Sequence, residues 1–149
     1  QKLIHYQNLP IALLGAVLSL WRSTLSERLS LNEKAAGRIT HIRLGDFFKD
    51  PVSARSFAVT RLLDINAPTD LVTDQEEVLE EELRKLDLSH PVRILPSRGM
   101  SAWDLMALMC RYEFISTNGS TLAFWAAVIR NAHFESTNQE HDEQTHNLY

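Results

Sequence analysis

The first pattern in the chain is an apolar run that repeats at helical spacing. Its apolar residues recur at steps of three and four, which places them on one face of a helix. They are Leu13, Leu14, Val17, Leu18, Trp21 and Leu25. Pro10 suits the first turn of a helix, so we expect a buried helix over residues 10–29. The apolar stretch holds about a dozen residues, fewer than the roughly 20 that a membrane span needs, and it lacks the cleavage pattern of a signal peptide.

Beyond this helix the chain alternates between short strands and helices. The strands are expected over residues 38–44, 70–74, 91–96 and 112–116. The helices are expected from Ser53 to about Asp64, after Thr73 or Asp74, from Ser101 to Arg111 and over residues 122–130. Ser53, Thr73 or Asp74, and Ser101 are the expected amino-terminal caps. This alternation predicts an α/β fold, with a Rossmann-like parallel sheet and helices on both of its faces.

Two of these helices carry patterns that have both a structural and a chemical interpretation. The helix after Asp74 has acidic residues near its amino end, where they complement the helix dipole. These are Glu76, Glu77, Glu80, Glu81 and Glu82. A solvated face is the favoured interpretation, and paired catalytic carboxylates are the alternative. The helix from Ser101 carries Trp103 and a stripe of Leu and Met, which indicates core packing rather than a cofactor site.

Composition limits what the chain does without assigning a function. Its 149 residues suffice for one domain with its own core, and 44% hydrophobic and 23% charged residues are ordinary for a globular domain. The net charge of −4 argues against nucleic-acid binding, which normally needs a basic face. Cys110 stands alone in an apolar run, so we expect a buried thiol, no disulfide and a reducing compartment.

We expect three parts along the chain. Residues 1–36 form an amino-terminal helix and loop, residues 37–134 one Rossmann-like domain, and residues 135–149 a polar tail. Because Gln1 is not an initiator methionine, the chain is expected to be a piece of a longer polypeptide. His141 and His146 lie in the tail without the spaced partners of a metal site, so no metal is expected.

Polar side chains gather where the first strand ends. His41, Arg43 and Asp46 follow one another at its carboxyl end. Strand alternation puts His41 and Arg43 on one face, and Ile42 and Leu44 on the opposite face toward the core. An ion pair between Arg43 and Asp46 is the structural alternative to a role in ligand binding.

Similar clusters follow the other strands. They are Thr73 and Asp74, then Arg98, then Asn118, Ser120 and Thr121. The carboxyl ends of parallel strands share one edge, where open α/β sheets bind their ligands. The turn at 117–121 leads into a helix whose amino end favours an anion, and Arg43 offers a planar fork for two phosphate oxygens. Together these features favour a phosphorylated ligand.

The familiar phosphate-binding and hydrolase motifs are absent from the sequence. It contains no G-x-G-x-x-G, no G-x-x-x-x-G-K-[ST], no G-x-S-x-G and no H-E-x-x-H. A nucleotide would therefore be held by a different arrangement.

The stretch H-I-R-L-G-D at residues 41–46 resembles the H-x-R-R-x-D signature of the α-1,2-, α-1,6- and protein O-fucosyltransferases. It is nearest to the H-I-R-R-G-D form of the α-1,2 family. Residues 71–74 are similar to that family's strand followed by S/T-D. Residues 104–106, 115–116 and 120–127 resemble its D-L-M … I-x-N-S-T-F-S-W-W-x-A block, so the resemblance covers roughly residues 37–130.

This resemblance implies the carboxyl-terminal, Rossmann-like lobe of a two-lobed, GT-B-type glycosyltransferase that binds GDP-fucose with no metal or other cofactor. By that analogy His41 and Asp104 contact the guanine, Arg43 and Ser120 the β-phosphate, and Thr121 a phosphate from the helix start. Arg43 is the expected catalytic residue, because a fixed arginine stabilises charge on the departing diphosphate. The expected donor-binding residues are His41, Arg43, Gly45, Asp46, Asp74, Asp104, Asn118, Gly119, Ser120 and Thr121.

Two positions depart from the family pattern. Leu44 stands where the family has a second arginine, which removes a cation from the site region. Asn118-Gly119-Ser120 replaces the expected Asn-Ser-Ser/Thr spacing, which leaves open, by one position, the residue that lies against the phosphate. Most of an amino-terminal, acceptor-binding lobe is also missing from the chain.

Three functions remain open at this stage. The leading hypothesis is a donor-binding domain that transfers fucose from GDP-fucose to a glycan acceptor by an inverting, metal-independent mechanism. The alternatives are a degenerate, non-catalytic interaction module and a transferase that uses another nucleotide sugar. The expected partners are a nucleotide sugar, a glycan acceptor, the missing lobe and a membrane surface by peripheral association, but no nucleic acid. The expected location is the cytoplasm or membrane of a bacterial-type cell, or the Golgi lumen of a eukaryote.

Overall fold

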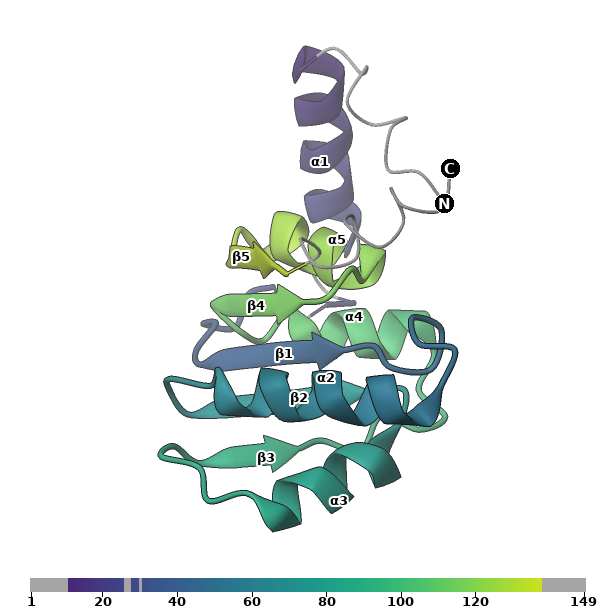
Figure 1. Ribbon diagram of the computed structural model, residues 1–149. Helices are drawn as coiled ribbons and strands as arrows, with labels where there is room; N and C mark the ends of the chain where they lie inside the picture. The colour runs from purple at the N-terminus through teal and green to yellow at the C-terminus, as the bar shows by residue number, and fades with distance from the viewer. Residues whose placement is uncertain (1–10, 26–27, 30, 138–149) are drawn as a thin grey trace.

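The computed structural model of the chain describes residues 11–25, 28–29 and 31–137, which form the predicted α/β fold (Figure 1). In chain order the elements are α1 (Ile11–Leu25), β1 (Arg38–Ile42), α2 (Pro51–Leu63), β2 (Thr69–Thr73), α3 (Glu76–Lys85), β3 (Val92–Ile94), α4 (Ala102–Met109), β4 (Phe114–Thr117), α5 (Thr121–Arg130) and β5 (His133–Ser136). Gln1, Pro10, His141 and His146, discussed above, lie outside the described residues.

The described strands are all parallel and form one open, five-stranded sheet in the order β3-β2-β1-β4-β5. From β1 the chain runs outward through β2 to β3, returns across the sheet, and continues from β4 to β5. The direction of winding therefore reverses between β1 and β4. This strand order confirms the Rossmann-like sheet that the alternation of elements predicts.

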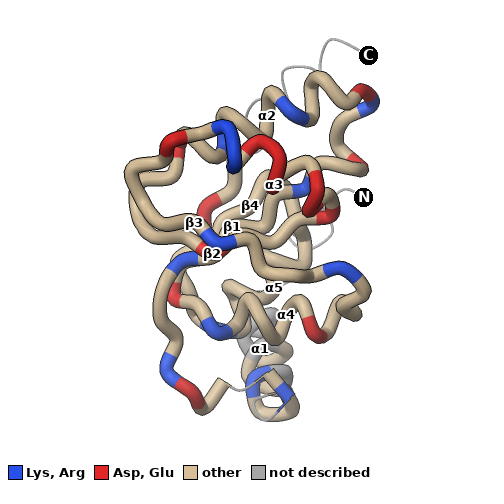
Figure 2. Tube along the Cα trace, turned by 90° about the horizontal axis from the view of Figure 1, so that it is seen from below, with Lys and Arg blue, Asp and Glu red and all other residues tan. Residues whose placement is uncertain are grey.

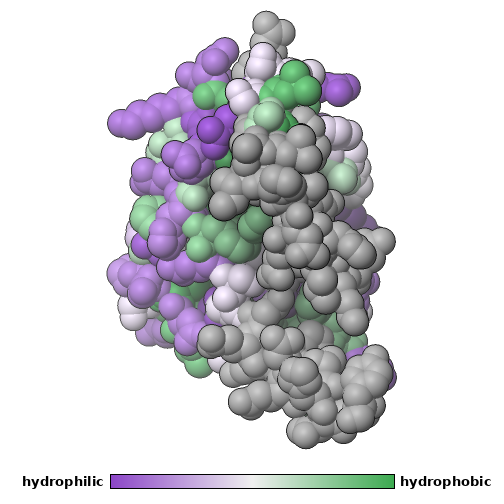
Figure 3. All heavy atoms as spheres, turned by 90° about the horizontal axis from the view of Figure 1, so that it is seen from above, coloured by the Kyte–Doolittle hydropathy of each residue, from purple (hydrophilic) through white to green (hydrophobic). Residues whose placement is uncertain are grey.

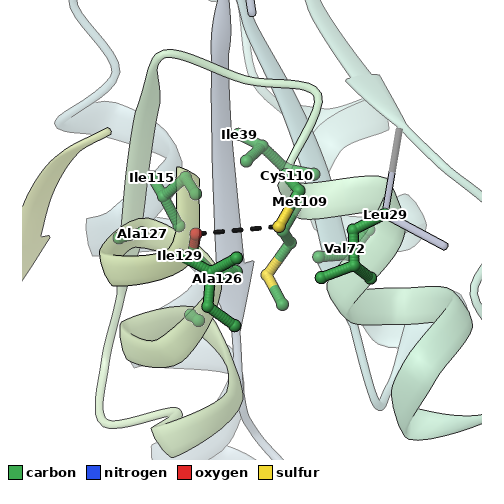
Figure 4. Packing of buried hydrophobic residues seen from close by; sticks show 10 residues of the cluster. Leu29, Ile39, Val72, Met109, Cys110, Ile115, Ala126, Ala127 and Ile129 are labelled. Atoms are coloured by element: carbon green, nitrogen blue, oxygen red, sulfur yellow. Dashed lines mark hydrogen bonds between the residues drawn. The ribbon is translucent and has the colours of Figure 1, made fainter. Parts of the chain in front are cut away.

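Helices cover the two faces of the sheet in separate groups. α2 and α3 lie over one face, and α4 and α5 lie over the other (Figure 1). Alternate residues of β1 enter the two cores, so that Ile42 packs in the α2–α3 core and Ile39 in the α4–α5 core. Figure 4 shows the α4–α5 core, in which Cys110 is buried as expected and donates a hydrogen bond to the Ala126 carbonyl at 3.7 Å.

The fifth strand is not predicted by the sequence. β5 pairs with β4 over residues 133–136, so the expected boundary between domain and tail at 134/135 falls inside the sheet and is corrected. Only Phe134 of this strand is partly buried, and its neighbours in the strand are exposed and polar. Four residues with one apolar position carry too weak a pattern to predict a strand.

The amino-terminal caps agree with the expectation in α4 and differ in α2. Ser101 caps α4 and forms a capping box with Asp104. The cap of α2 is Asp50, whose carboxylate accepts the N–H of Ser53 at 2.8 Å, so the expected Ser53 cap is wrong.

α3 begins after Gln75 without a side-chain cap, so neither Thr73 nor Asp74 caps it as expected. Its glutamates are only in part the solvated face that the sequence predicts. Glu82 is 7% exposed and is held by basic side chains of α2 and of its own helix. Glu76 accepts backbone N–H groups from the loop after β3. Two of the five glutamates therefore hold the structure together.

α1 stands beside α5 at one end of the molecule and projects away from the sheet (Figure 1). Leu20 of this helix is 65% exposed, whereas Val17 and Leu25 of the predicted buried face are partly buried, and Leu25 packs against the α4–α5 core. The other side chains of that predicted face, Leu13, Leu14, Leu18 and Trp21, lie outside what the structure describes. Figure 3, which looks onto this end of the molecule, shows apolar side chains among hydrophilic ones at the surface. Trp103 of α4, expected in the core, is 48% exposed. No helix in the described ranges is both long enough and apolar enough to cross a membrane.

Candidate functional site

The carboxyl ends of β1 and β4 are the point where the chain reverses its direction through the sheet. In open α/β sheets, a ligand-binding crevice forms at such a switch point. The segments that follow these two strands, residues 43–46 and 118–121, contain most of the residues predicted to bind the donor. We call this switch point the β1–β4 crevice, after the crevice that such a point forms in open α/β sheets. Asp74 adjoins it from the end of β2.

Asn118 binds the backbone of Arg43 with both ends of its carboxamide. Its Oδ1 accepts the N–H of Arg43 at 2.7 Å, and its Nδ2 donates to the Arg43 carbonyl at 2.7 Å. The residue is only 6% exposed. Asn118, predicted to touch a ligand, thus joins the loop after β4 to the loop after β1.

Asp74 binds the same loop from the other side. Its carboxylate accepts the N–H of Leu44 at 2.8 Å and the N–H of Gly45 at 2.9 Å. A Cβ atom at position 45 would lie only 2.9 Å from Asp74 Oδ2, so this close approach favours glycine. Asp74 and Gly45 therefore act together to hold the backbone of the loop.

Thr117 is part of the same network, although the sequence does not single it out as a site residue. Its hydroxyl donates to the His41 carbonyl at 2.9 Å and accepts the N–H of Ser120 at 3.0 Å. Ser120 in turn caps α5, and its hydroxyl accepts the N–H of Ala123 at 3.2 Å. The signal for Thr117 is its place between a predicted strand and an Asn-Gly turn.

The turn between β4 and α5 ends in an exposed helix start. Gly119 has a φ of 113°, a backbone conformation that residues with a side chain rarely adopt. Thr121 is the first residue of α5 and is exposed. The amino end of this ten-residue helix therefore offers backbone N–H groups and the positive end of the helix dipole at the edge of the sheet.

The Arg43 side chain lies along its own loop at the rim of the crevice. Its guanidinium pairs with Asp46 and lies over the ring of Phe47, 4.8 Å from the ring centre. The ion pair that the sequence left as an alternative is therefore present. The Asp46 side chain is 74% exposed, and exposed pairs are worth only about 0–1 kcal/mol, so a more highly charged anion can displace it.

His41 is buried at the carboxyl end of β1, with 8% of its surface exposed. Its Nδ1 is buried and has no hydrogen-bond partner among the described residues. Burial, with a smaller contribution from the positive charge of Arg43, lowers the pKa of the imidazole to about 4 against the opposing charge of Asp74. The ring is therefore neutral at pH 7. Unsatisfied buried polar atoms are rare, and each one calls for an explanation such as an ordered water, local strain or a functional role.

Leu44 does not change the charge of the crevice. Its side chain is 1% exposed and packs with Ile42 in the α2–α3 core, which confirms the predicted apolar face of this segment. Position 44 therefore points away from the crevice. The expectation that Leu44 removes a cation from the site region is corrected accordingly.

Asp104 and Arg98 lie outside this network. The Asp104 carboxylate accepts the Ser101 hydroxyl at 2.8 Å as part of the α4 capping box, and this structural role replaces the guanine contact that the resemblance implies. Arg98 is exposed and pairs with Glu77 at 3.5 Å. In the part of the chain that the structure describes, neither makes a hydrogen bond or ion pair with the residues of the crevice.

A hollow of about 490 Å³ lies next to the crevice, between the loops after β2 and β3. The residues that line it include Asp74, Glu76, Glu77 and Glu80, with Arg98 as the basic residue. Acidic residues are also visible along α3 in Figure 2. This lining repels a diphosphate, so the α5 side of the crevice is the better position for an anion. Within the described ranges, no group of three or more side chains is arranged to hold a metal ion.

A comparison with protein-family models, a search of curated proteins and a search of solved structures each find no match to this chain. The functional interpretation therefore depends on the geometry of the β1–β4 crevice and on the resemblance of the residues that line it.

Proposed function

We propose that this domain binds the nucleoside diphosphate of a sugar donor in the β1–β4 crevice, as the donor-binding lobe of a glycosyltransferase. The proposed donor is GDP-fucose, and the proposed reaction is transfer of fucose to a glycan acceptor with inversion and without a metal. The strand order supports the position of the site. The resemblance of residues 41–46 to the fucosyltransferase signature supports the donor.

The observation that carries this proposal is the unpartnered Nδ1 of His41. Asn118, Asp74 and Thr117 have hydrogen-bond partners within the protein. Among the buried side-chain polar atoms of the described residues, the Nδ1 of His41 is the one without a hydrogen-bond partner. A neutral imidazole nitrogen donates or accepts one hydrogen bond according to its tautomer. It is therefore suited to an uncharged base such as guanine, which reaches this enclosed nitrogen only if the side chains around it move aside.

Arg43 supplies the charge stabilisation in this mechanism. When the bond between the anomeric carbon and the diphosphate oxygen breaks, its electron pair stays on that oxygen, and negative charge grows there. The oxygen of the acceptor hydroxyl forms the new bond from the opposite side, which inverts the configuration, and the hydroxyl proton is released to solvent. The Arg43 guanidinium and the N–H groups at the start of α5 are the donors that stabilise the growing charge. Asp46 must release Arg43, and its exposure permits this.

Calorimetric titration with GDP tests the proposal. The chain should bind GDP more tightly than UDP or CMP. Arg43→Ala should weaken GDP binding by about tenfold or more, because a hydrogen bond to a charged group is worth about 1.5–3 kcal/mol. Asp46→Ala is the matched variant: it removes the carboxylate that competes for the same guanidinium, so it should strengthen GDP binding.

Equal GDP affinity in the original chain and in Arg43→Ala would remove Arg43 from the mechanism. No binding at millimolar GDP would remove the donor site altogether. Tighter binding of UDP or CMP would favour a transferase with a different donor.

A non-catalytic interaction module is the second candidate function, and the exposure of α1 favours it. Leu20 is 65% exposed, and Arg22 near the end of this helix donates to the Val128 carbonyl of α5 at 3.0 Å. Exposed apolar side chains, such as Leu20 among those described on this helix, are typical of an interaction surface where they gather. A chain that binds no nucleotide, but forms an oligomer that Leu20→Glu dissociates, would support this function over the first.

A further inference from the structure

The backbone of residues 43–45 is held from two sides by side chains that belong to other loops. Asn118, after β4, bonds the N–H and the carbonyl of Arg43, and Asp74, after β2, bonds the N–H groups of Leu44 and Gly45. The bond lengths lie between 2.7 and 2.9 Å. The segment is therefore fixed at both of its ends before any ligand binds.

We infer that Asn118 is a positioning residue for Arg43, which sets the direction in which the guanidinium leaves the rim of the crevice. Asp74, through its close approach to Gly45, supports the same backbone from the opposite side. This role rests on the proposed function. It replaces the direct ligand contacts that the sequence predicts for Asn118, Asp74 and Gly45.

The direction of an arginine side chain depends first on its Cα–Cβ bond, which the backbone orients. Because the N–H and the carbonyl of Arg43 are both bonded, the backbone at this residue has little freedom. Phe47 then restricts the far end of the side chain, where the guanidinium lies 4.8 Å from the ring centre. A donor held in place in this way needs little reorganisation when charge develops on the leaving group.

A carboxamide is the side chain that satisfies both backbone groups of Arg43. Its oxygen accepts and its nitrogen donates, in the positions that the Arg43 N–H and carbonyl require. Aspartate at position 118 would place an oxygen against the Arg43 carbonyl, where two acceptors repel. Alanine would leave both backbone groups without a partner at a place that is 6% exposed.

NMR spectroscopy of the whole chain tests this role with the variants Asn118→Ala, Asn118→Asp and Gly45→Ala. The first two readouts need no ligand: the amide exchange rates of Arg43 and Leu44, and the ring-current shift that Phe47 causes in the side-chain protons of Arg43. The third readout is GDP affinity. Ser116→Ala is the matched control, because the Ser116 hydroxyl also joins β4 to β1, through a bond to Thr40 at 2.7 Å.

Asn118→Ala and Asn118→Asp should speed amide exchange at Arg43 by about tenfold, abolish the ring-current shift and weaken GDP binding by about three- to tenfold. Gly45→Ala should speed exchange at Leu44, because the new Cβ displaces the Asp74 carboxylate. Ser116→Ala should lower the melting temperature and leave the Arg43 shift and the GDP affinity unchanged.

An unchanged Arg43 shift in Asn118→Ala, or the same change in Ser116→Ala, overturns the positioning role. So does unchanged GDP affinity in Asn118→Ala. If the original chain binds no GDP, the proposed function fails, and the ligand-free Arg43 shift alone decides whether Asn118 positions Arg43. If Asn118→Ala and Asn118→Asp do not fold, Asn118→Gln, which keeps the carboxamide but shifts it by one methylene group, decides it by the same shift: an unchanged Arg43 shift overturns the positioning role.

Discussion

His41 takes up a proton far less readily in the folded protein than in the unfolded chain. Its pKa is about 4 in the fold, chiefly because of burial, and 6.5 in the absence of the fold. Between these two values the unfolded chain binds more protons, so the free energy of unfolding falls as the pH falls. The full effect is about 3 kcal/mol, since one pKa unit corresponds to about 1.4 kcal/mol.

His41→Gln should therefore remove part of the acid sensitivity of the protein. Urea unfolding at pH 7.5 and pH 4.5 gives the loss of stability for each form, and the loss should be about 2–3 kcal/mol smaller in His41→Gln. Carboxylates with a lowered pKa, such as Asp50 and Asp70, destabilise both forms equally on acidification. The same loss in both forms would contradict a buried, neutral His41.

Sequence patterns bring out the residues of the β1–β4 crevice, but not what each of them binds. The alternation of β1 correctly places Ile42 and Leu44 in the core, because that pattern is local. Asn118 bonds a residue 75 positions away, and Asp74 bonds one 30 positions away. These pairings depend on which strands become neighbours, and the order of strands in the sheet does not follow from their order in the chain.

At the level of single elements, two sequence signals compete for the start of α2: the Asp50-Pro51 pair and Ser53. The structure follows the Asp50-Pro51 signal. Pro51 disfavours the helical conformation for the residue before it, and Asp50 accordingly has φ −126° and ψ 146°. Proline itself suits the first helical position, where no N–H is needed. Asp50 is therefore placed to cap the helix, and this Asp-Pro signal was available in the sequence beside Ser53.

Asp50→Ala should lower the free energy of unfolding by about 1 kcal/mol, because the N–H of Ser53 loses its acceptor. Ser53→Ala is the matched comparison and should have a smaller effect, since it keeps the Ser53 N–H and removes only the hydroxyl that also contacts Asp50. Chemical denaturation at pH 7 measures both. A larger loss in Ser53→Ala would contradict the assignment of Asp50 as the cap.

β5 depends on its neighbour more than on its own sequence. Its backbone is bonded to β4, from the His133 N–H to the Glu113 carbonyl at 2.8 Å and from the Thr137 N–H to the Thr117 carbonyl at 3.1 Å. Of its side chains only that of Phe134 is partly buried. The strand therefore forms because β4 offers an open edge, which a pattern of four residues does not reveal.

For the whole molecule, the two groups of helices leave part of one sheet face open. On the side of the sheet that carries α2, the strands β4 and β5 present Phe114, Ser116, His133 and Glu135 to a hollow of about 190 Å³. Strands buried on both faces normally carry continuous apolar runs. The polar residues here agree with a face that no described helix covers.

The alternation of strands and helices was enough to predict the parallel sheet, because each parallel connection needs a crossover, usually a helix. It was not enough to predict the exposure of Trp103. An apolar side chain is buried only where another element packs against it: Leu25 of α1 packs partly against the α4–α5 core, whereas Leu20 of the same helix is exposed. Fold class thus followed from local patterns, whereas burial depended on tertiary arrangement.

Titration of the isotope-labelled chain with GDP, followed by NMR spectroscopy, tests the β1–β4 crevice most directly. A donor site there predicts saturable shift changes at residues 41–46 and 117–121, including the ring nitrogens of His41, and little change at residues 133–136 of β5. Saturable changes confined to the open face of β4 and β5, or no change up to millimolar GDP, would contradict it.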